Sequence, residues 1–321
     1  MADLDDLLTK TSRTFALSIP LLPEPTRLEV TLGYLLFRIA DTFEDAKDWA
    51  IDRKVEALHR FCELLELGCD PTAKAGAGGD RAFRRILEEA AAGWADAAPI
   101  DHDGYQELLR EVPDVLEAFF ALDEPARGLI REHVTRTSVG MADYVARTRD
   151  GELALRDLED LQHYCYIVAG IVGEMLTELF LLGRPELSAV ADGLRRRARR
   201  CGEAQQLVNI LKDSAFDADE GRSYLAGSER TKVFALARAD LETAGEYILL
   251  LQESGTERGL VAFNALPVLL AKEALDVVET DGPGAKVERP RVFSIMETLE
   301  RNLDAGRPVV SLNGAAATDA R

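Results

Sequence analysis

The sequence lacks any uninterrupted apolar run of about 18 residues, which is close to the minimum for a membrane-spanning helix. Its first residues, Met-Ala-Asp-Leu-Asp-Asp, also lack the basic and apolar regions of a signal peptide. The chain is nevertheless 47% hydrophobic, so it can bury a large core. We therefore expect a cytoplasmic protein with no transmembrane segment, at most peripheral to a membrane.

Basic charge is scarce as well. The chain has 38 Lys and Arg against 57 Asp and Glu, which gives a net charge of −19 at pH 7. Nucleic acids and anionic bilayer surfaces attract proteins through basic patches, so we expect neither as a partner. We expect a monomer. An apolar product would still need a membrane or a partner protein to receive it, so transient membrane association during product release is left open.

Cysteine and histidine are few and scattered. The four cysteines show no metal-type pairing and are expected to be free thiols, and the four histidines form no ligand cluster. A G-x-G-x-x-G dinucleotide fingerprint is absent, as is a twelve-residue EF-hand loop. The missing EF-hand argues against a Ca²⁺-binding helical protein.

Helical periodicity runs through nearly every segment, and no convincing alternating strand is found. The sequence therefore predicts an all-α protein. No linker divides the chain, so we expect one domain over residues 1–305 and a disordered tail over residues 306–321. The expected helices cover residues 25–47, 51–67, 80–94, 102–120, 124–147, 155–182, 186–215, 229–253, 257–278 and 290–304.

Three carboxylates follow an apolar segment near the N-terminus. Asp41, Glu44 and Asp45 are spaced i, i+3 and i+4, so their side chains converge on one face of a helix. Like charges at this spacing repel by roughly 0.2–0.5 kcal/mol per pair on an exposed helix. Such a cluster predicts a bound cation, and carboxylate oxygens suit Mg²⁺, which commonly bridges to substrate phosphates.

A second polar stripe lies far along the chain at Asn209, Asp213 and Asp217. A four-residue step overshoots one helical turn by only about 40°, so these side chains follow one side of a helix. Two acidic stripes that face each other across a cavity would hold more than one Mg²⁺ and a diphosphate. The alternative is a pair of solvated acidic faces, which are common in a chain with 57 acidic residues.

Five distinctive blocks follow one another between about residues 11 and 275. The blocks are Ser12-Arg-Thr-Phe15, Tyr34-x-x-x-Arg38-x-x-Asp41-x-x-Glu44-Asp45, Tyr164-Cys-Tyr-Ile-Val-Ala-Gly170, Asn209-x-x-x-Asp213-x-x-x-Asp217 with Gly221-Arg222, and Ala262-Phe-Asn-Ala-Leu-Pro267. In this order they resemble the blocks of the squalene/phytoene synthase family. The segment 140–144 followed by Tyr164-Cys165 looks more like the squalene synthase branch, although Tyr164-Cys-Tyr166 is also typical of phytoene synthases.

The resemblance implies a class I isoprenoid synthase fold, a helical bundle around a central cavity. It also implies head-to-head condensation of two allylic prenyl diphosphates, expected to be two farnesyl diphosphates joined through presqualene diphosphate to squalene. Mg²⁺ would be required, and NADPH would serve a reductive step if one occurs.

The resemblance also assigns roles to residues. Tyr164 would face the cationic intermediate, and Asp41 and Asp213 would be catalytic through the metal. The metal ligands would be Asp41, Glu44, Asp45, Asp213 and Asp217. Diphosphate oxygens would contact Arg13, Arg38, Lys212 and Arg222, and the substrate cavity would include Phe15, Tyr34, Val168, Gly170, Gln205 and Asn209. Lys286 and Arg289 would help to hold the cofactor phosphates.

Several of these residues could instead have a purely structural role. Phe15 and Tyr34 could be core aromatics, Gly170 could allow close helix packing, and Gln205 could be a polar surface residue. Arg38 and Arg222 could simply pair with acidic side chains.

Three departures from the family pattern bear on function. Lys212 stands where the family usually has Arg, Phe216 replaces an acidic residue, and Glu288 falls where a positive charge is expected. A phytoene or dehydrosqualene synthase without a reductive step therefore stays an alternative. A non-catalytic scaffold or assembly protein of the same fold is disfavoured, because the first motif is intact and Asp213 and Asp217 are kept.

Overall fold

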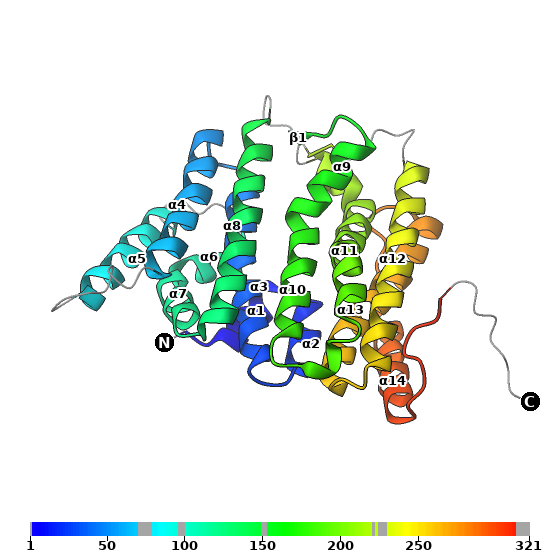
Figure 1. Ribbon diagram of the computed structural model, residues 1–321. Helices are drawn as coiled ribbons and strands as arrows, with labels where there is room; N and C mark the ends of the chain where they lie inside the picture. The colour runs from blue at the N-terminus through cyan, green and yellow to red at the C-terminus, as the bar shows by residue number, and fades with distance from the viewer. Residues whose placement is uncertain are drawn as a thin grey trace, which may run out of the picture. The chain divides into compact units, whose positions relative to one another are not determined.

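The computed structural model describes residues 2–69, 79–95, 100–148, 153–219, 222–223 and 230–312 (Figure 1). For residues 69, 79, 153–154, 215–219 and 222–223, only the backbone is described. The chain divides into two compact units, one formed by residues 1–19 and 24–149 and the other by residues 20–23 and 150–321. The single domain predicted for residues 1–305 stays a prediction, and each unit is described by itself.

Both units are built from helices, which confirms the predicted all-α class. In the described part of the first unit these are α1 (Leu4–Thr11), α2 (Phe15–Ser18), α3 (Thr26–Glu44), α4 (Ile51–Cys69), α5 (Gly79–Ala95), α6 (Asp103–Arg110), α7 (Val112–Phe120) and α8 (Glu124–Ala146). A short 3₁₀ turn, η1 (Ile19–Leu21), follows α2.

The second unit contains the remaining elements. They are β1 (Leu153–Ala154), α9 (Leu158–Cys165), the π-helical turn η2 (Tyr166–Gly170), α10 (Ile171–Leu181), the 3₁₀ turn η3 (Pro185–Leu187), α11 (Ala191–Asp219), β2 (Arg222–Ser223), α12 (Arg230–Glu253), α13 (Arg258–Asp281) and α14 (Arg289–Asp304).

Local sequence explains where several helices begin. The Asp3 carboxylate accepts hydrogen bonds from the amides of Asp5 and Asp6 at 3.1 Å and caps α1. Asp157 caps α9 in the same way through the amide of Asp160, at 2.9 Å. These side chains satisfy backbone donors that the first helical turn leaves unpaired.

Helix α3 is the centre of the first unit and packs against α1, α4, α6, α7 and α8. At its C-terminal end, Phe43 contacts Trp94 of α5 with ring centroids 4.7 Å apart, and Trp49 and Phe61 at 5.9 and 6.2 Å. These four aromatic side chains are buried. Because large buried rings contribute several kcal/mol each, they fix the end of α3 that carries the first acidic motif.

Helix α11 is the centre of the second unit. It packs against the continuous helical stretch α9–η2–α10 and against α12 and α13 (Figure 1). Two glycines let the backbones approach closely. A Cβ added at Gly173 would lie 2.2 Å from the Ala198 carbonyl oxygen, and one added at Gly202 would lie 1.9 Å from that of Ala169. Neither distance leaves room for a methyl group, so glycine is required at both positions.

The secondary structure differs from the sequence predictions in three places. The predicted helix 102–120 is two helices, since α6 ends at Arg110 and α7 begins with Pro113 in its first turn. The predicted helix 155–182 contains the π-helical turn η2. The structure also contains two short strands that the sequence did not indicate: β1 and β2 pair in parallel, with Leu153 opposite Arg222, and two-residue strands are too short to produce an alternating pattern.

The C-terminal segment 306–312 is not disordered, contrary to the prediction. Val309 and Val310 are each only 4% exposed. The Gln252 side chain donates to the Arg307 carbonyl at 2.7 Å and accepts from the Val309 amide at 3.1 Å. A small apolar anchor and side-chain hydrogen bonds thus hold this segment, neither of which the Gly- and Ala-rich composition indicated. Residues 313–321 lie outside the described part.

One continuous helical stretch in the described part, Leu158–Leu181, is long and apolar enough to cross a membrane by length and composition. Within its most apolar window, 56% is buried inside the protein. A core helix meets the same criteria, so this is weak evidence for a membrane span.

We predict that Gly202→Ala lowers the free energy of unfolding by at least about 2 kcal/mol, because the new methyl group meets a backbone oxygen that cannot turn aside. Urea denaturation followed by circular dichroism measures this. Gly193→Ala, in the same helix, is the matched control, because its methyl group meets only the ends of the Leu250 and Arg197 side chains. Equal stability of the two variants would contradict the close packing.

Candidate active site

Three chemically active side chains form an open stripe on the otherwise buried middle of α3. Every residue from Glu29 to Phe43 is buried except Tyr34, Arg38 and Asp41. These three are spaced i, i+4 and i+7, so they lie on one side of the helix. The sequence predicted all three as site residues, and the structure gives them a shared, partly solvent-accessible face.

The stripe is joined by direct contacts. Nη1 of Arg38 lies 3.2 Å from Oδ2 of Asp41, and these side chains keep 25% and 29% of their surface exposed. Nε of Arg38 donates to the Tyr34 hydroxyl at 3.3 Å, and that hydroxyl donates to the Thr11 carbonyl at 2.7 Å. Arg38 thus pairs with an acidic side chain, as a purely structural role would require, yet its guanidinium stays partly exposed and accessible to a ligand.

Burial disfavours the charge on Asp41. It raises the pKa of the Asp41 carboxyl from 3.8 to about 6, against the opposing effect of Arg38 and with a further increase from Asp45. A carboxylate with this environment gains from a nearby cation. The oxygen-only donor set of Asp41, Glu44 and Asp45 therefore fits Mg²⁺.

Glu44 and Asp45 lie where α3 ends, since Asp45 is its C-terminal cap and its amide donates to the Asp41 carbonyl at 2.9 Å. Lys54 of α4 donates to the Glu44 carbonyl at 2.9 Å. Among the described residues, no three His, Cys, Asp or Glu side chains are gathered closely enough to hold a metal ion. Metal binding by these carboxylates stays a prediction.

Phe15 and Arg13 precede this helix. The Phe15 ring lies 5.6 Å from that of Tyr34, so the two predicted cavity aromatics pack on each other. Arg13 is exposed in the connection between α1 and α2.

Sequence reasoning missed Tyr105 and His102. The Tyr105 ring centroid lies 5.5 Å from Cζ of Arg38, and the His102 ring stacks on Tyr105 at 4.2 Å. Burial raises the pKa of the Tyr105 phenol, so the ring beside Arg38 is uncharged at neutral pH. Tyr105 lies far along the chain from the acidic motif, outside every recognised block, and no local pattern marks it.

In the second unit, Tyr164 is 4% exposed and lies one residue before the end of α9. The π-helical turn η2 starts at Tyr166 and carries Val168 and Gly170. Such turns often occur at functional sites, because one extra residue redirects the side chains that come after it. A Cβ at Gly170 would lie 2.8 Å from the Tyr166 ring and 3.3 Å from the Arg199 side chain, which favours the close-packing reading of this glycine.

The second acidic motif lies on the C-terminal half of α11. Nζ of Lys212 lies 3.3 Å from Oδ1 of Asn209 and 3.3 Å from Oδ2 of Asp213. Gln205 is half-buried and Asn209 is exposed. Lys212 thus partly neutralises the carboxylate of its neighbour. For Asp217, Phe216 and Arg222 only the backbone is described, so the predicted side-chain roles of these residues lie outside the described structure.

The segment with the predicted cofactor residues is tied to this motif. The Gly284 amide donates to the Lys212 carbonyl at 2.7 Å. Gly282 and Gly284 have φ angles of 93° and 84°, a conformation that favours glycine. Lys286 and Arg289 come after this turn and are exposed.

Two buried carboxylates lie outside the motifs. Arg199 pairs with Glu203 at 2.6 Å, and Arg200 lies 3.8 Å from Asp240 of α12. Burial raises the pKa of both carboxyls, that of Asp240 to about 6. Their arginine partners indicate structural roles: the Arg199–Glu203 pair lies within α11, and the Arg200–Asp240 contact joins α11 to α12.

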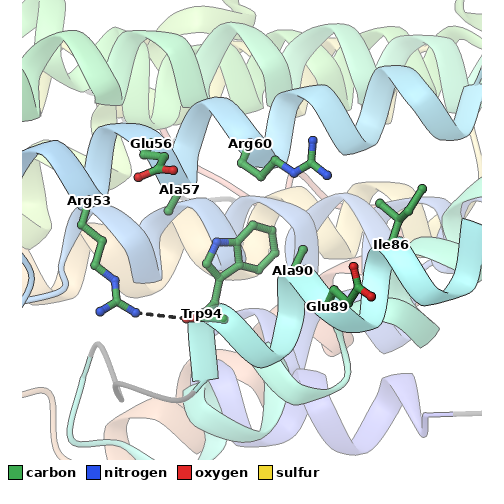
Figure 2. Close-up of a pocket in the computed structure, with 9 residues that line it drawn as sticks. Arg53, Glu56, Ala57, Arg60, Ile86, Glu89, Ala90 and Trp94 are labelled. Atoms are coloured by element: carbon green, nitrogen blue, oxygen red, sulfur yellow. Dashed lines mark hydrogen bonds between the residues drawn. The ribbon is translucent and has the colours of Figure 1, made fainter.

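A cavity of about 340 Å³ lies between α4 and α5 (Figure 2). Arg53 and Arg60 of α4 and Glu89 and Trp94 of α5 line it. None of the predicted site residues is among its lining residues, so it is distinct from the predicted substrate cavity.

Comparison with known proteins identifies the family. The model of the squalene/phytoene synthase family matches residues 8–245. The chain belongs to the squalene/phytoene synthase family. The match includes both acidic motifs and Tyr164, which confirms the family resemblance of the first four ordered blocks, whereas the fifth block, Ala262–Pro267, lies beyond the matched residues.

Curated relatives in this family are squalene synthases. The chain is 30% identical over 222 residues to that of Schizosaccharomyces pombe, which covers 68% of this chain and 42% of the relative. It is 29% identical over 225 residues to that of Saccharomyces cerevisiae, covering 68% and 44%. The chain therefore matches less than half the length of these relatives.

Solved structures support the fold. Two structures of TcSQS, each in complex with a ligand, match with TM-scores of 0.66 and 0.67. Sequence identity is 23% and 24%, and both matches cover 98% of this chain and 92% of the other. The all-α fold of squalene/phytoene synthases is thus confirmed.

We predict that Asp41→Asn raises the free energy of unfolding at pH 7 by on the order of 1 kcal/mol, after allowance for solvent exposure. The pKa of Asp41 is raised to about 6 in the folded state, so ionisation costs stability as pH rises from about 4 to 6. The gain of the variant should be absent below about pH 4, grow across this window and stay constant above it. Urea denaturation between pH 3.5 and 7.5 measures this; a gain independent of pH would contradict the raised pKa.

Proposed function

We propose that this protein condenses two allylic prenyl diphosphates head to head, with farnesyl diphosphate as substrate and squalene as product. The open stripe of Tyr34, Arg38 and Asp41 on a buried helix carries the proposal. A chain that exposes a tyrosine, a guanidinium and a desolvated carboxylate on one face of its central helix has the groups that diphosphate chemistry needs. The squalene synthases among its relatives favour the same reaction.

In the first unit, Arg38 and Arg13 would bind diphosphate oxygens, which a guanidinium contacts in a bidentate manner. Asp41, Glu44 and Asp45 would hold Mg²⁺, which neutralises the leaving diphosphate when bound. The contact of Arg38 with both Tyr34 and Asp41 supports these roles, because it places a cation next to a carboxyl whose pKa burial raises.

In the second unit, Asp213 and Asp217 would provide the other metal ligands, and Lys212 and Arg222 the other diphosphate contacts. Lys212 acts as a point charge where an arginine would form a fork. Its contacts to Asn209 and Asp213 support this role, because they keep its charge beside the polar side chains of the second motif.

The apolar part of the substrate would meet aromatic and small side chains. Tyr164 would stabilise the allylic cation with its ring or move a proton, and the π-helical turn just after it supports a specialised local geometry. Phe15, Tyr34, Val168, Gly170, Gln205 and Asn209 would complete the cavity walls.

A reductive step with NADPH is proposed for the second half of the reaction. Lys286 and Arg289 would contact the cofactor phosphates, and the hydrogen bond from Gly284 to Lys212 supports a link between this segment and the second motif. A phytoene or dehydrosqualene synthase is the alternative, favoured by the exposed Glu288 between these two basic residues.

We predict that Asp41→Asn and Asp213→Asn each lower turnover by at least about 10²-fold, because each weakens the charge that stabilises diphosphate departure. The double variant should lose less than the product of the single effects if both residues serve one step. Diphosphate release from farnesyl diphosphate at saturating Mg²⁺ measures this. Asp48→Asn, an exposed carboxylate just beyond the first motif, is the control. Full activity in either single variant would refute the assignment.

The product test separates the two branches. With farnesyl diphosphate and Mg²⁺ alone, we expect diphosphate release with accumulation of presqualene diphosphate, dehydrosqualene or hydroxysqualene, and with NADPH we expect squalene. Lys286→Glu should weaken NADPH use more than substrate use, since it removes a cationic phosphate contact. Arg301→Glu, on an exposed part of α14, is the matched charge reversal. Products indifferent to NADPH, or faster turnover of geranylgeranyl diphosphate, would favour the phytoene branch.

A further inference from the structure

We propose that Tyr105 is a positioning residue that holds the Arg38 guanidinium in the orientation that receives the substrate diphosphate. The inference rests on the proposed function of Arg38 and adds a residue from α6, outside the acidic motifs. Tyr105 would act through Arg38 and not by touching the reacting atoms.

The Arg38 guanidinium lies close to two tyrosine rings. Its Cζ is 5.5 Å from the ring centroid of Tyr34 and 5.5 Å from that of Tyr105. Both distances are within the range of about 6 Å in which an aromatic face attracts a cation. Contacts with two rings restrict a long, flexible side chain, so less rotamer entropy is lost when a ligand fixes it.

Tyr105 provides a contact to Arg38 that the polar partners of Arg38 do not provide. Nε is directed to the Tyr34 hydroxyl and Nη1 to Asp41, and both partners are on α3 itself. Tyr105 is the ring that another helix brings to the guanidinium. Its own ring is supported on the side chain of His102, stacked at 4.2 Å.

The last turn of α1 fixes both rings. The Thr11 carbonyl accepts the hydrogen bond from the Tyr34 hydroxyl at 2.7 Å. The adjacent Lys10 holds α6 through its side chain, whose Nζ lies 2.8 and 2.9 Å from the two carboxylate oxygens of Glu107. A Cβ at Gly104 would lie 2.7 Å from the Lys10 carbonyl oxygen, so α6 also approaches α1 closely beside Tyr105.

These contacts separate two roles of the tyrosine. The ring faces Arg38, so its loss should weaken diphosphate binding, whereas removal of the hydroxyl alone should not. Tyr105→Leu removes the ring and Tyr105→Phe keeps it. Phe83→Leu removes a buried ring in the same unit that packs on Phe120, away from Arg38, and serves as the control for lost packing.

The test measures binding of inorganic diphosphate by calorimetry with Mg²⁺ present, together with KM and kcat for diphosphate release from farnesyl diphosphate. Tyr105→Leu should weaken diphosphate binding and raise KM by about tenfold. Tyr105→Phe should stay within about twofold of the unmodified protein. Phe83→Leu should lower the melting temperature while leaving both values unchanged.

A double variant tests whether Tyr105 acts through Arg38. Arg38→Gln removes the cation, so Tyr105→Leu should add no more than about twofold in that background. If Tyr105→Leu does not fold, Lys10→Met replaces it: this surface change loosens α6 with the ring intact and should raise KM about threefold.

If the unmodified protein binds diphosphate and releases it from substrate, three results would overturn the inference about Tyr105 while the proposed function stands. They are an unchanged KM in Tyr105→Leu or its replacement, a loss in Tyr105→Phe equal to that in Tyr105→Leu, and a full tenfold further loss in the double variant. If the unmodified protein neither binds diphosphate nor releases it from farnesyl diphosphate, the proposed function fails and the inference fails with it.

Discussion

The partly desolvated pair of Arg38 and Asp41 is the constraint on which the first unit depends. Each charge loses hydration beside the buried core, and the raised pKa of Asp41 shows that Arg38 does not fully compensate. A fold that stabilises α3 through Phe43 and its aromatic neighbours can tolerate this local cost. The uncompensated carboxylate is then available to a cation, which is what a diphosphate-binding site requires.

In the second unit, the corresponding constraint is the close packing of helix backbones. Gly173 and Gly202 bring the α9–η2–α10 stretch against α11, and the arginines of α11 pair with carboxylates on both neighbouring helices. The segment with Tyr164 and the segment with Asp213 are therefore held by the same contacts. The second unit does not support the alternative of a non-catalytic scaffold protein, because Lys212, Asn209 and Asp213 remain grouped on a partly exposed face of α11.

The two branches of the family differ in the chemistry of the second step, after the two substrates have been joined. The tether from Gly284 to Lys212 gives the 282–289 segment a defined place beside α11, which a reductive site would need. The negative charge of Glu288 would repel the cofactor phosphates that Lys286 and Arg289 are proposed to contact. Family membership and the stripe on α3 therefore support condensation more strongly than they support reduction.

The sequence by itself determined the all-α class and most helix positions, because helical periodicity is a local property of the chain. The resemblance to the family marked Tyr34, Arg38 and Asp41 as site residues, and the structure showed that these three form the exposed side of α3. Only the tertiary structure placed Tyr105 beside Arg38, made Gly202 indispensable and anchored Val309 and Val310. These features arise where segments distant in the chain meet. The distances and side-chain directions at such contacts depend on how helices pack, and no residue pattern within one segment encodes them.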